Sequence, residues 1–204
     1  DYNTWDWGGN MIVHQVLQNP DGTLKVKVPD TIDDAFTKPL SIKMKALKGD
    51  WQMSNTSAHV ESPHGYASLL LPTVPSLSKL ELDTSFDSPP REFGVAIQVD
   101  ENFDLGYYLC FEPYRNRVQF KTGIRMFEDG GKMFPYEVEM ERPLALEPLA
   151  PYHIKMFVQD SILEVYINED IALSTRMFNH RGRQFGLFVS EGSAKFHNIR
   201  LLSV

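Results

Sequence analysis

The stretch VQDSILEVYINEDIALSTRMF, residues 158–178, concentrates charged side chains that could do chemistry. It holds Asp160, Glu164, the neighbouring pair Glu169 and Asp170, and further on Arg176. Two carboxyl groups about 5–10 Å apart across a substrate cleft would form the acid and base, or acid and nucleophile, of a glycosidase. Carboxylates and Arg can equally accept and donate the hydrogen bonds that bind a neutral ligand.

The same stretch also has the spacing of a β-hairpin. In SILEVYIN the apolar residues alternate, so we expect Leu163, Val165 and Ile167 to face a core. Glu164 then lies on the opposite face, and the pair at 169–170 falls in the following turn. No pocket is evident from this arrangement. A solvated sheet face is therefore the favoured interpretation, with a glycosidase-type pair and a ligand-binding site as the alternatives.

Alternation with a period of two continues along most of the chain. Five further segments show it: KLELDTSF, EFGVAIQVD, GYYLCFEP, NRVQFKTG and YHIKMFVQD. Turn-rich joints such as EPYRN and FEDGG separate the segments, and helical patterns are almost absent. We therefore predict an all-β fold, an antiparallel β-sandwich of jelly-roll or concanavalin-like type.

A shorter unit precedes the predicted sandwich. VLQNPDGTLKVKV has the Pro and Gly of a tight turn at residues 19–22, which predicts a β-hairpin. A polar connector, DDAFTKPL, follows the hairpin. We place a boundary there, with residues 1–35 as an N-terminal segment and linker and residues 36–204 as the sandwich module.

Composition limits the classes of partner. The 204 residues carry a net charge of −7 with Lys and Arg scattered, so no nucleic-acid surface is predicted. No window is apolar enough to cross a membrane, and no membrane partner is expected. The single cysteine, Cys110, excludes an internal disulfide. Localisation stays open, with a secreted or cell-surface bacterial protein slightly favoured over a cytoplasmic one.

The candidate ligand residues lie at one strand end and one turn. QVDENFDLGYY presents Gln98, Asp100, Glu101 and Tyr108, the last on the face opposite Tyr107. In VSEGSA, Glu191 is expected at a turn between two terminal strands, where it could accept hydrogen bonds from sugar hydroxyl groups. The alternative interpretation is an acidic surface loop and an exposed turn residue.

No metal site, cofactor or catalytic residue is predicted within the chain. Asp100, Glu101, Asn102 and Asp104 could offer oxygen ligands to calcium, but their spacing is not that of an EF-hand. The six histidines have no zinc-binding spacing. EDGGK lacks the context of a phosphate-binding loop and is expected to form a hairpin turn.

Two segments resemble one family. VQDSILEVYINEDIALSTRMF, followed by GLFVSEGSAKFHNIRL, resembles the C-terminal end of family 32 glycoside hydrolases, the invertase, inulinase and levanase group. WGGNMIVHQVLQNPDGTLKVKVP resembles the segment by which the catalytic propeller of such enzymes closes and leads into the C-terminal sandwich. GYYLCFEPYRNRVQF is similar to variants of that sandwich and to fructan-binding modules, whereas residues 36–90 match weakly.

The resemblance implies an accessory role. In this family the propeller carries catalysis through N-D-P, R-D-P and E-C motifs, and none of these strings occurs here. The chain is thus expected to be noncatalytic, part of a β-fructosidase-like parent protein, and to bind fructan or a sucrose-like carbohydrate. The alternative is a structural sandwich that stabilises the catalytic propeller or mediates dimerisation. The resemblance also implies that Trp5 and Trp7 pack at the domain junction rather than form a sugar platform.

Overall fold

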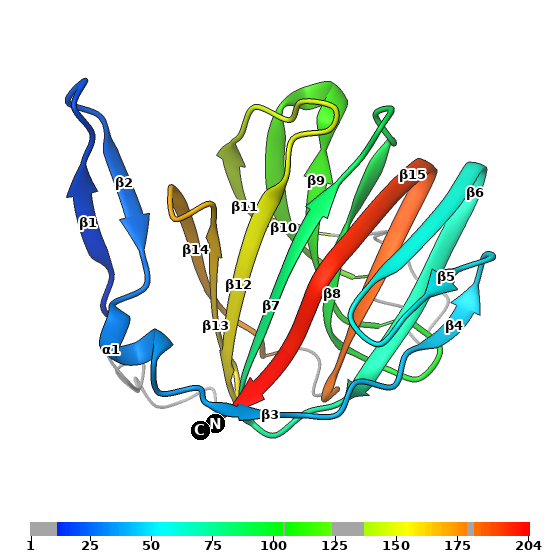
Figure 1. Cartoon of the computed structure of the whole chain (residues 1–204), viewed down its shortest axis with the longest axis horizontal. Coiled ribbons are helices and arrows are strands. Elements are labelled where there is room, and N and C mark those ends of the chain that lie inside the picture. Colours follow the sequence, from blue (N-terminus) through cyan, green and yellow to red (C-terminus); the bar gives the residue numbers. More distant parts are fainter. Residues whose placement is uncertain (1–11, 104, 124–136, 179–181) are drawn as a thin grey trace, which may run out of the picture.

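The computed structural model describes residues 12–103, 105–123, 137–178 and 182–204. Figure 1 shows two β-sheets packed face to face, with a separate hairpin at one side. The predicted all-β sandwich is confirmed, and so is the predicted hairpin before it. Trp5, Trp7, Asp104 and the EDGGK turn lie outside the described residues. The division of the chain at residue 35 stays a prediction.

The elements follow one another in this order: β1 (Gln15–Gln18), β2 (Leu24–Lys27), α1 (Asp30–Asp33), β3 (Lys38–Pro39), β4 (Lys45–Lys48), β5 (Gln52–Met53), β6 (Ala58–Thr73), β7 (Leu77–Ser85), β8 (Glu92–Val99), β9 (Tyr107–Glu112), the 3-10 turn η1 (Pro113–Arg115), β10 (Arg117–Thr122), β11 (Glu137–Pro143), β12 (Tyr152–Gln159), β13 (Ile162–Ile167), β14 (Ile171–Arg176) and β15 (Gln184–Ser203). None of the described helices is long and apolar enough to cross a membrane.

Two long strands, β6 and β15, belong to both sheets. They pair antiparallel with each other from Gln184 to Phe196 of β15. The first part of β15 pairs with β8 and its last part pairs with β7. The first sheet therefore runs from β4 through β6, β15, β8, β9 and β10 to β11, and the second from β5 through β6, β15, β7, β12 and β13 to β14.

The core fills the space between the two sheets. Alternate residues of each strand point into it, as the period of two predicted, and rings from facing strands pack together. Phe93 stacks on Phe111 with ring centroids 5.2 Å apart, and Phe196 lies 6.2 Å from Trp51. The core also contains Leu163 and Val165 of β13, as expected.

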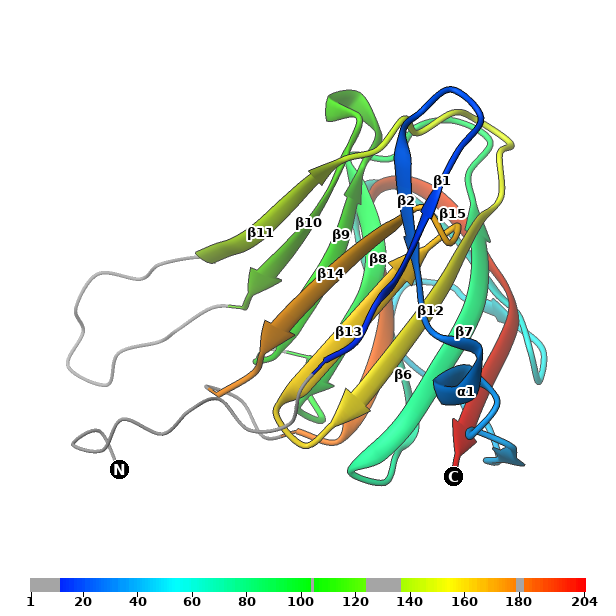
Figure 2. The ribbon, with the colours of Figure 1, turned by 90° about the vertical axis from the view of Figure 1, so that its left-hand side faces the viewer.

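The N-terminal segment covers the outer face of the second sheet. Val28 and Phe36 pack there against Phe157 and Tyr166. Figures 1 and 2 show the hairpin β1–β2 beside β13 and β14, where the amide of Val26 donates a 3.0 Å hydrogen bond to a carbonyl of the β13–β14 turn. The outer side of β13 is therefore covered. The expectation that Glu164 lies on a solvated face is wrong, because the side chain of Glu164 is 10% exposed.

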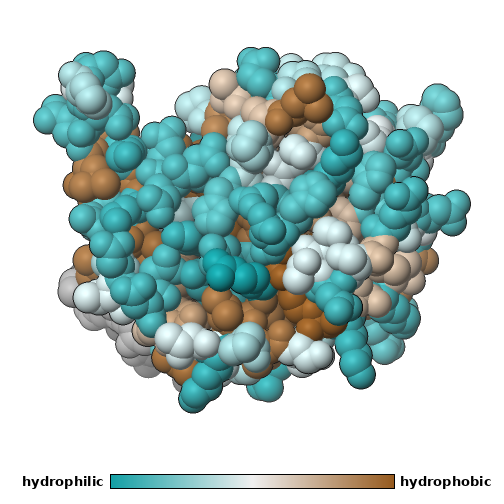
Figure 3. Space-filling model, in the orientation of Figure 1, coloured by the Kyte–Doolittle hydropathy of each residue, from teal (hydrophilic) through white to brown (hydrophobic). Residues whose placement is uncertain are grey.

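The rest of that outer face carries a network of ion pairs. Asp33 of α1 pairs with Lys79 and, at 2.8 Å, with Lys155. Glu81 pairs with Lys79 at 3.0 Å and with His153 at 3.3 Å. Hydrogen bonds from these partners, His153 first, hold the pKa of Glu81 well below its usual range. Figure 3 shows this face as largely hydrophilic, with hydrophobic surface along its lower edge.

The packing of the core predicts a large effect of one truncation. Phe196→Ala should lower the free energy of unfolding by about 3–5 kcal/mol, because the ring is fully buried and leaves a cavity. Urea unfolding monitored by circular dichroism measures the change. The control is Leu24→Ala on the hairpin, where the side chain is 65% exposed and a change below about 0.5 kcal/mol is expected. A loss below about 1 kcal/mol for Phe196→Ala would contradict the packing described.

Candidate functional site

A pocket of about 420 Å³ lies at one end of the sandwich, and we call it the end pocket. Its lining comes from the end of β8, the β6–β7 loop, the β12–β13 turn and the segment that joins β14 to β15: Val74, Pro75, Ser76, Ile97, Gln98, Val158, Asp160, Ser161, Met177, Phe178, Gly182, Arg183, Gln184 and Phe185. The volume falls within the range of about 300–1,000 Å³ that small-molecule sites occupy.

Backbone hydrogen bonds hold these loops together. The amide of Asp160 donates to the carbonyl of Ser76 at 2.9 Å, and the amide of Val74 donates to the carbonyl of Arg183 at 2.8 Å. Gly182 packs closely on the end of β8, since a Cβ atom there would lie 2.3 Å from the carbonyl oxygen of Gln98. These contacts hold the walls of the end pocket in place.

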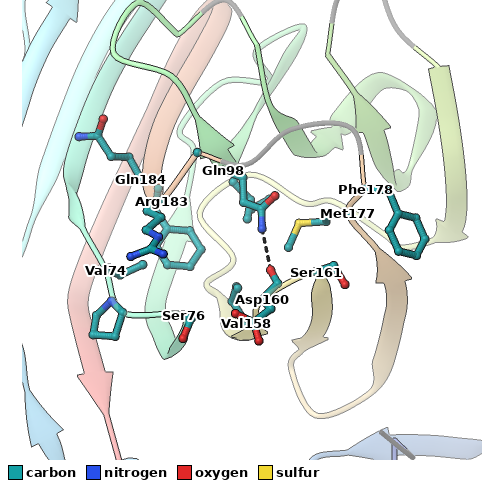
Figure 4. Close-up of a pocket in the computed structure, with 14 residues that line it drawn as sticks. Val74, Ser76, Gln98, Val158, Asp160, Ser161, Met177, Phe178, Arg183 and Gln184 are labelled. Carbon is teal, nitrogen blue, oxygen red and sulfur yellow. Dashed lines mark hydrogen bonds between the residues drawn. The ribbon is translucent and has the colours of Figure 1, made fainter. Parts of the chain in front are cut away.

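Gln98 connects two of these walls. Its Nε2 donates a 2.7 Å hydrogen bond to the backbone carbonyl of Asp160, with Oε1 at the other end of the amide (Figure 4). Oε1 is buried and has no hydrogen-bond partner among the described residues. Both Gln98, at φ 53°, and Asp160, at φ 52°, have left-handed backbones, which non-glycine residues adopt at some cost in energy.

The lining combines several kinds of hydrogen-bonding group with an aromatic ring. Asp160 supplies a carboxylate, Arg183 a guanidinium group, and Ser76 and Ser161 hydroxyl groups. Phe178 stands at the rim with 70% of its surface exposed. Asp160 is the one carboxylate among the lining residues that the structure describes. The pair of carboxyl groups that glycoside hydrolysis requires is therefore not present in this lining.

The structure brings one of the five predicted ligand residues, Gln98, into the end pocket. Asp100 follows it and caps the next loop, where its carboxylate accepts a 3.3 Å hydrogen bond from the amide of Leu105. Glu101 is exposed in that loop and does not line the pocket. Ligand contacts by Asp100 and Glu101 stay a prediction. Among the described residues, no cluster of His, Cys, Asp or Glu could hold a metal ion.

Tyr108 lies on the outer face of the first sheet, opposite the fully buried Tyr107, as expected. Its ring packs edge-on against Phe188 at 5.6 Å and tilts against Phe103 at 6.0 Å. Its hydroxyl group donates a 3.1 Å hydrogen bond to the carbonyl of Phe103. These contacts give Tyr108 a structural task, namely to fix the β8–β9 loop on Gly186, whose missing side chain leaves room for the Phe103 ring.

The sequence led us to expect Glu191 at a turn between two strands, and this expectation is wrong. It sits within the single long strand β15, at a bulge with φ 50°, and pairs with Arg91 at 2.8 Å. In the β8–β15 ladder Ser190 pairs with Glu92, whereas Gln184 pairs with Val99. Glu191 and the end pocket are therefore at opposite ends of β8.

Sequence comparison places this chain among known proteins. The family model described as glycosyl hydrolases family 32 C terminal matches residues 44–203. The chain belongs to this family. The predicted family is thereby confirmed, and the module can be compared with other proteins of the same fold. A comparison with curated proteins gives no match.

Several solved structures share the fold of the module. A carbohydrate-binding module, CBM66, from Bacillus subtilis has a TM-score of 0.66 and 20% identity, over 82% of this chain and 99% of that one. An exo-inulinase from Aspergillus awamori has a TM-score of 0.61 and 14% identity, over 94% of this chain. A fructosyltransferase from A. japonicus has a TM-score of 0.55 and 15% identity. The chain covers 34% and 31% of these two enzymes.

The contacts of Tyr108 predict that truncation of its side chain lowers the stability of the fold and does not act through a ligand site. Tyr108→Ala should lower the free energy of unfolding by about 2–3 kcal/mol, since the half-buried ring and its hydrogen bond are both lost. Tyr108→Phe keeps the ring and should cost about 1 kcal/mol. Chemical unfolding of the two variants checks both values. Equal losses for Ala and Phe would contradict the role given to the ring.

Proposed function

We propose that this chain is a noncatalytic accessory module of a family 32-like glycoside hydrolase and that it binds fructose-containing carbohydrate, a fructan or a sucrose-like sugar, in the end pocket. The observation that carries the proposal is the lining of that pocket, which offers a carboxylate, a guanidinium group, an amide and hydroxyl groups beside an exposed aromatic ring. Sugars present vicinal hydroxyl groups and C–H faces, and these are the protein groups that bind them.

The details of the pocket support a polyol ligand over an apolar one. The Nε2 atom of Gln98 holds the backbone of Asp160 in place, so the carboxylate of Asp160 is fixed at the pocket wall, where it can accept hydrogen bonds from ligand hydroxyl groups. Asp160 and Arg183 can bind adjacent hydroxyl groups from two sides of the opening. The Bacillus subtilis relative, named as a carbohydrate-binding module, has the same fold over nearly its whole length, which supports the same class of ligand here.

The second candidate is a structural role in the parent protein, either to stabilise the catalytic propeller or to mediate dimerisation. It is favoured by apolar surface around the N-terminal segment. Ile12, Val13, Ile32 and Val204 are exposed and line one apolar groove there. Such surface is typical of a contact between domains or subunits. The groove adjoins the end pocket, since Val158 lines both, but the exposed apolar residues of the groove are not part of the pocket lining.

Isothermal titration of the module with levan, inulin, sucrose and fructose, with dextran as a control, tests sugar binding. We expect saturable heat with at least one fructose-containing sugar. Asp160→Asn and Gln98→Ala should each weaken binding at least about tenfold, because the first removes a charged acceptor at the pocket wall and the second removes the hydrogen bond that holds Asp160 in place. Asp50→Asn and Gln52→Ala make the same kinds of change at exposed positions outside the end pocket and should have no effect.

The outcomes separate the two roles. Flat traces with every sugar would remove the binding role and leave the structural one. Binding that survives both pocket variants would move the sugar site elsewhere. Loss of binding in Glu101→Gln but not in Asp160→Asn would place it on the β8–β9 loop, where the sequence predicts Asp100 and Glu101. Circular dichroism of each variant confirms that the fold is retained.

A further inference from the structure

Away from the end pocket, four polar side chains tie the N-terminal segment to the sandwich. His14 lies just before β1, Glu164 and Tyr166 lie on β13, and Ser174 lies on β14. The Nδ1 atom of His14 is 2.9 Å from the Tyr166 hydroxyl, and its Nε2 atom is 3.1 Å from the Ser174 hydroxyl. The Ser174 hydroxyl is in turn 2.5 Å from Oε2 of Glu164. We call these four residues the latch cluster.

Glu164 is the buried end of the latch cluster. It lines a largely apolar groove of about 300 Å³, whose walls include Val28, Phe36 and Phe157. Its Oε1 atom is buried and has no hydrogen-bond partner among the described residues. A carboxylate buried in an apolar groove loses its hydration, and this loss costs more free energy than the burial of a neutral carboxyl group. Burial accordingly raises the pKa of Glu164 to about 7, against a smaller opposite effect of the Ser174 hydrogen bond.

The hydrogen bonds of the latch cluster have two complete arrangements. With Glu164 neutral, its O–H donates to Ser174, Ser174 donates to Nε2 of His14, and Nδ1–H donates to the Tyr166 oxygen. With Glu164 ionised, every donor reverses: Tyr166 donates to Nδ1, Nε2–H donates to Ser174, and Ser174 donates to the carboxylate. Both arrangements use a neutral imidazole, in its two different tautomers. The ionised one leaves a charged oxygen, Oε1, buried without a partner.

Few other ionisable groups act on the latch cluster. Among the described residues, His14 and Tyr166 are the titratable groups in contact with the cluster, whereas Arg176, on the same face of β14 as Ser174, donates a 3.4 Å hydrogen bond to Ser161 instead. Burial lowers the pKa of His14, and burial together with Glu164 raises the pKa of Tyr166, so both stay neutral near pH 7. Lys155 on the neighbouring strand β12 is paired with Asp33 and Glu169 instead. The charge of the cluster near neutral pH therefore follows Glu164.

We propose that the latch cluster makes docking of the N-terminal segment on the sandwich depend on pH. The segment is docked stably while Glu164 is neutral and less stably when Glu164 ionises. The segment it holds, residues 12–28, contributes His14 to the cluster and Val28 to the groove. When the segment lifts away, water reaches Glu164 and the ionised carboxyl group is solvated. The N-terminal segment is thus held tightly in mildly acidic solution and less tightly above neutral pH.

Proton linkage gives the direction and the size of the change in docking with pH. The pKa of Glu164 is about 7 with the segment docked, against 4.5 for a solvated carboxyl group, so docking is favoured at low pH, weakens as the pH rises from about 4.5 to about 7, and levels off above that. Glu164 alone would weaken docking about tenfold between pH 6 and pH 8. His14 opposes this change, because its docked imidazole resists protonation at pH 6. The net expectation is a loss of about threefold to tenfold.

Amide hydrogen exchange of the whole chain, followed by NMR at pH 6 and pH 8, tests the proposal. The reporter is the amide of Val26, which donates to the carbonyl of Asp170 only while the hairpin is docked. After correction for the intrinsic rate, its protection should fall about threefold to tenfold at pH 8. The amide of Ile199, which donates to Thr56 elsewhere in the sandwich, should keep its protection.

Substitutions identify the group responsible. Glu164→Gln removes the ionisation of residue 164 and leaves only that of His14, so the protection of the Val26 amide should no longer fall at pH 8 and should be equal or somewhat higher there. His153→Gln and Glu61→Gln are matched controls, a histidine in the other ion network and an exposed glutamate, and both should behave like the unmodified chain. A fall in protection that survives Glu164→Gln, or no fall in the unmodified chain, would overturn the proposal.

The tautomer of His14 gives a second readout that does not depend on a variant. Nitrogen-15 NMR of the ring should find the proton on Nδ1 below pH 7 and on Nε2 above it, in step with Glu164. A ring that keeps one tautomer throughout would also overturn the proposal. In Ser174→Ala, which interrupts the chain of hydrogen bonds, the tautomer should no longer follow the pH.

Discussion

The hydrogen-bonded ladder between β6 and β15 is the constraint on which the rest of the structure depends. Both strands run through the two sheets, so one continuous pairing fixes how the sheets face each other. A bulge after Ser190 bends β15 where it passes from one sheet to the other. Gly192 lies in this bend against Pro90, since a Cβ atom there would be 2.5 Å from the proline Cα. The loops that form the end pocket are aligned because they leave strands whose register this ladder sets.

On the outer faces of the two sheets, charged residues at outward positions of the strands are buried rather than exposed to solvent. On the first sheet, Lys121 is buried between Glu112 at 2.8 Å and Glu92 at 3.0 Å. On the second, Lys79 is buried between Asp33 and Glu81. Long charged side chains lie flat along the sheet and neutralise one another, so polar positions of a strand are shielded without entering the core. Alternation of apolar and polar residues with a period of two therefore identifies the core-facing residues, but it does not show that the other face of the strand is exposed to solvent.

This limit decides what could be predicted from the sequence. Alternation and turn residues identified the strands, the β1–β2 hairpin and the inward position of Tyr107, because these depend on neighbours in the chain. Glu164 was assigned to the wrong environment, because the segment that covers it is 150 positions away in sequence. The end pocket could be predicted only in part. Gln98 stood out at a strand end, but its partner Asp160, and Ser76 and Arg183 in the same lining, are brought beside it by tertiary pairing that no local pattern records.

The hairpin β12–β13 links the two sites that the module offers. Its two-residue turn, Asp160 and Ser161, forms one wall of the end pocket. Four residues after Asp160, Glu164 lies on the outer face of β13, under the N-terminal segment. The turn is fixed by Ser76 and Gln98, and the strand is paired on both sides, with β12 and β14. A change of charge at Glu164 is therefore relieved by the weakly held hairpin rather than by the turn. The turn that lines the end pocket is held by Ser76 and Gln98, whereas the groove beside it, which shares Val158 with the pocket, is closed by the N-terminal segment, so the proposed ligand site and the proposed docking of that segment rest on different contacts of the β12–β13 hairpin.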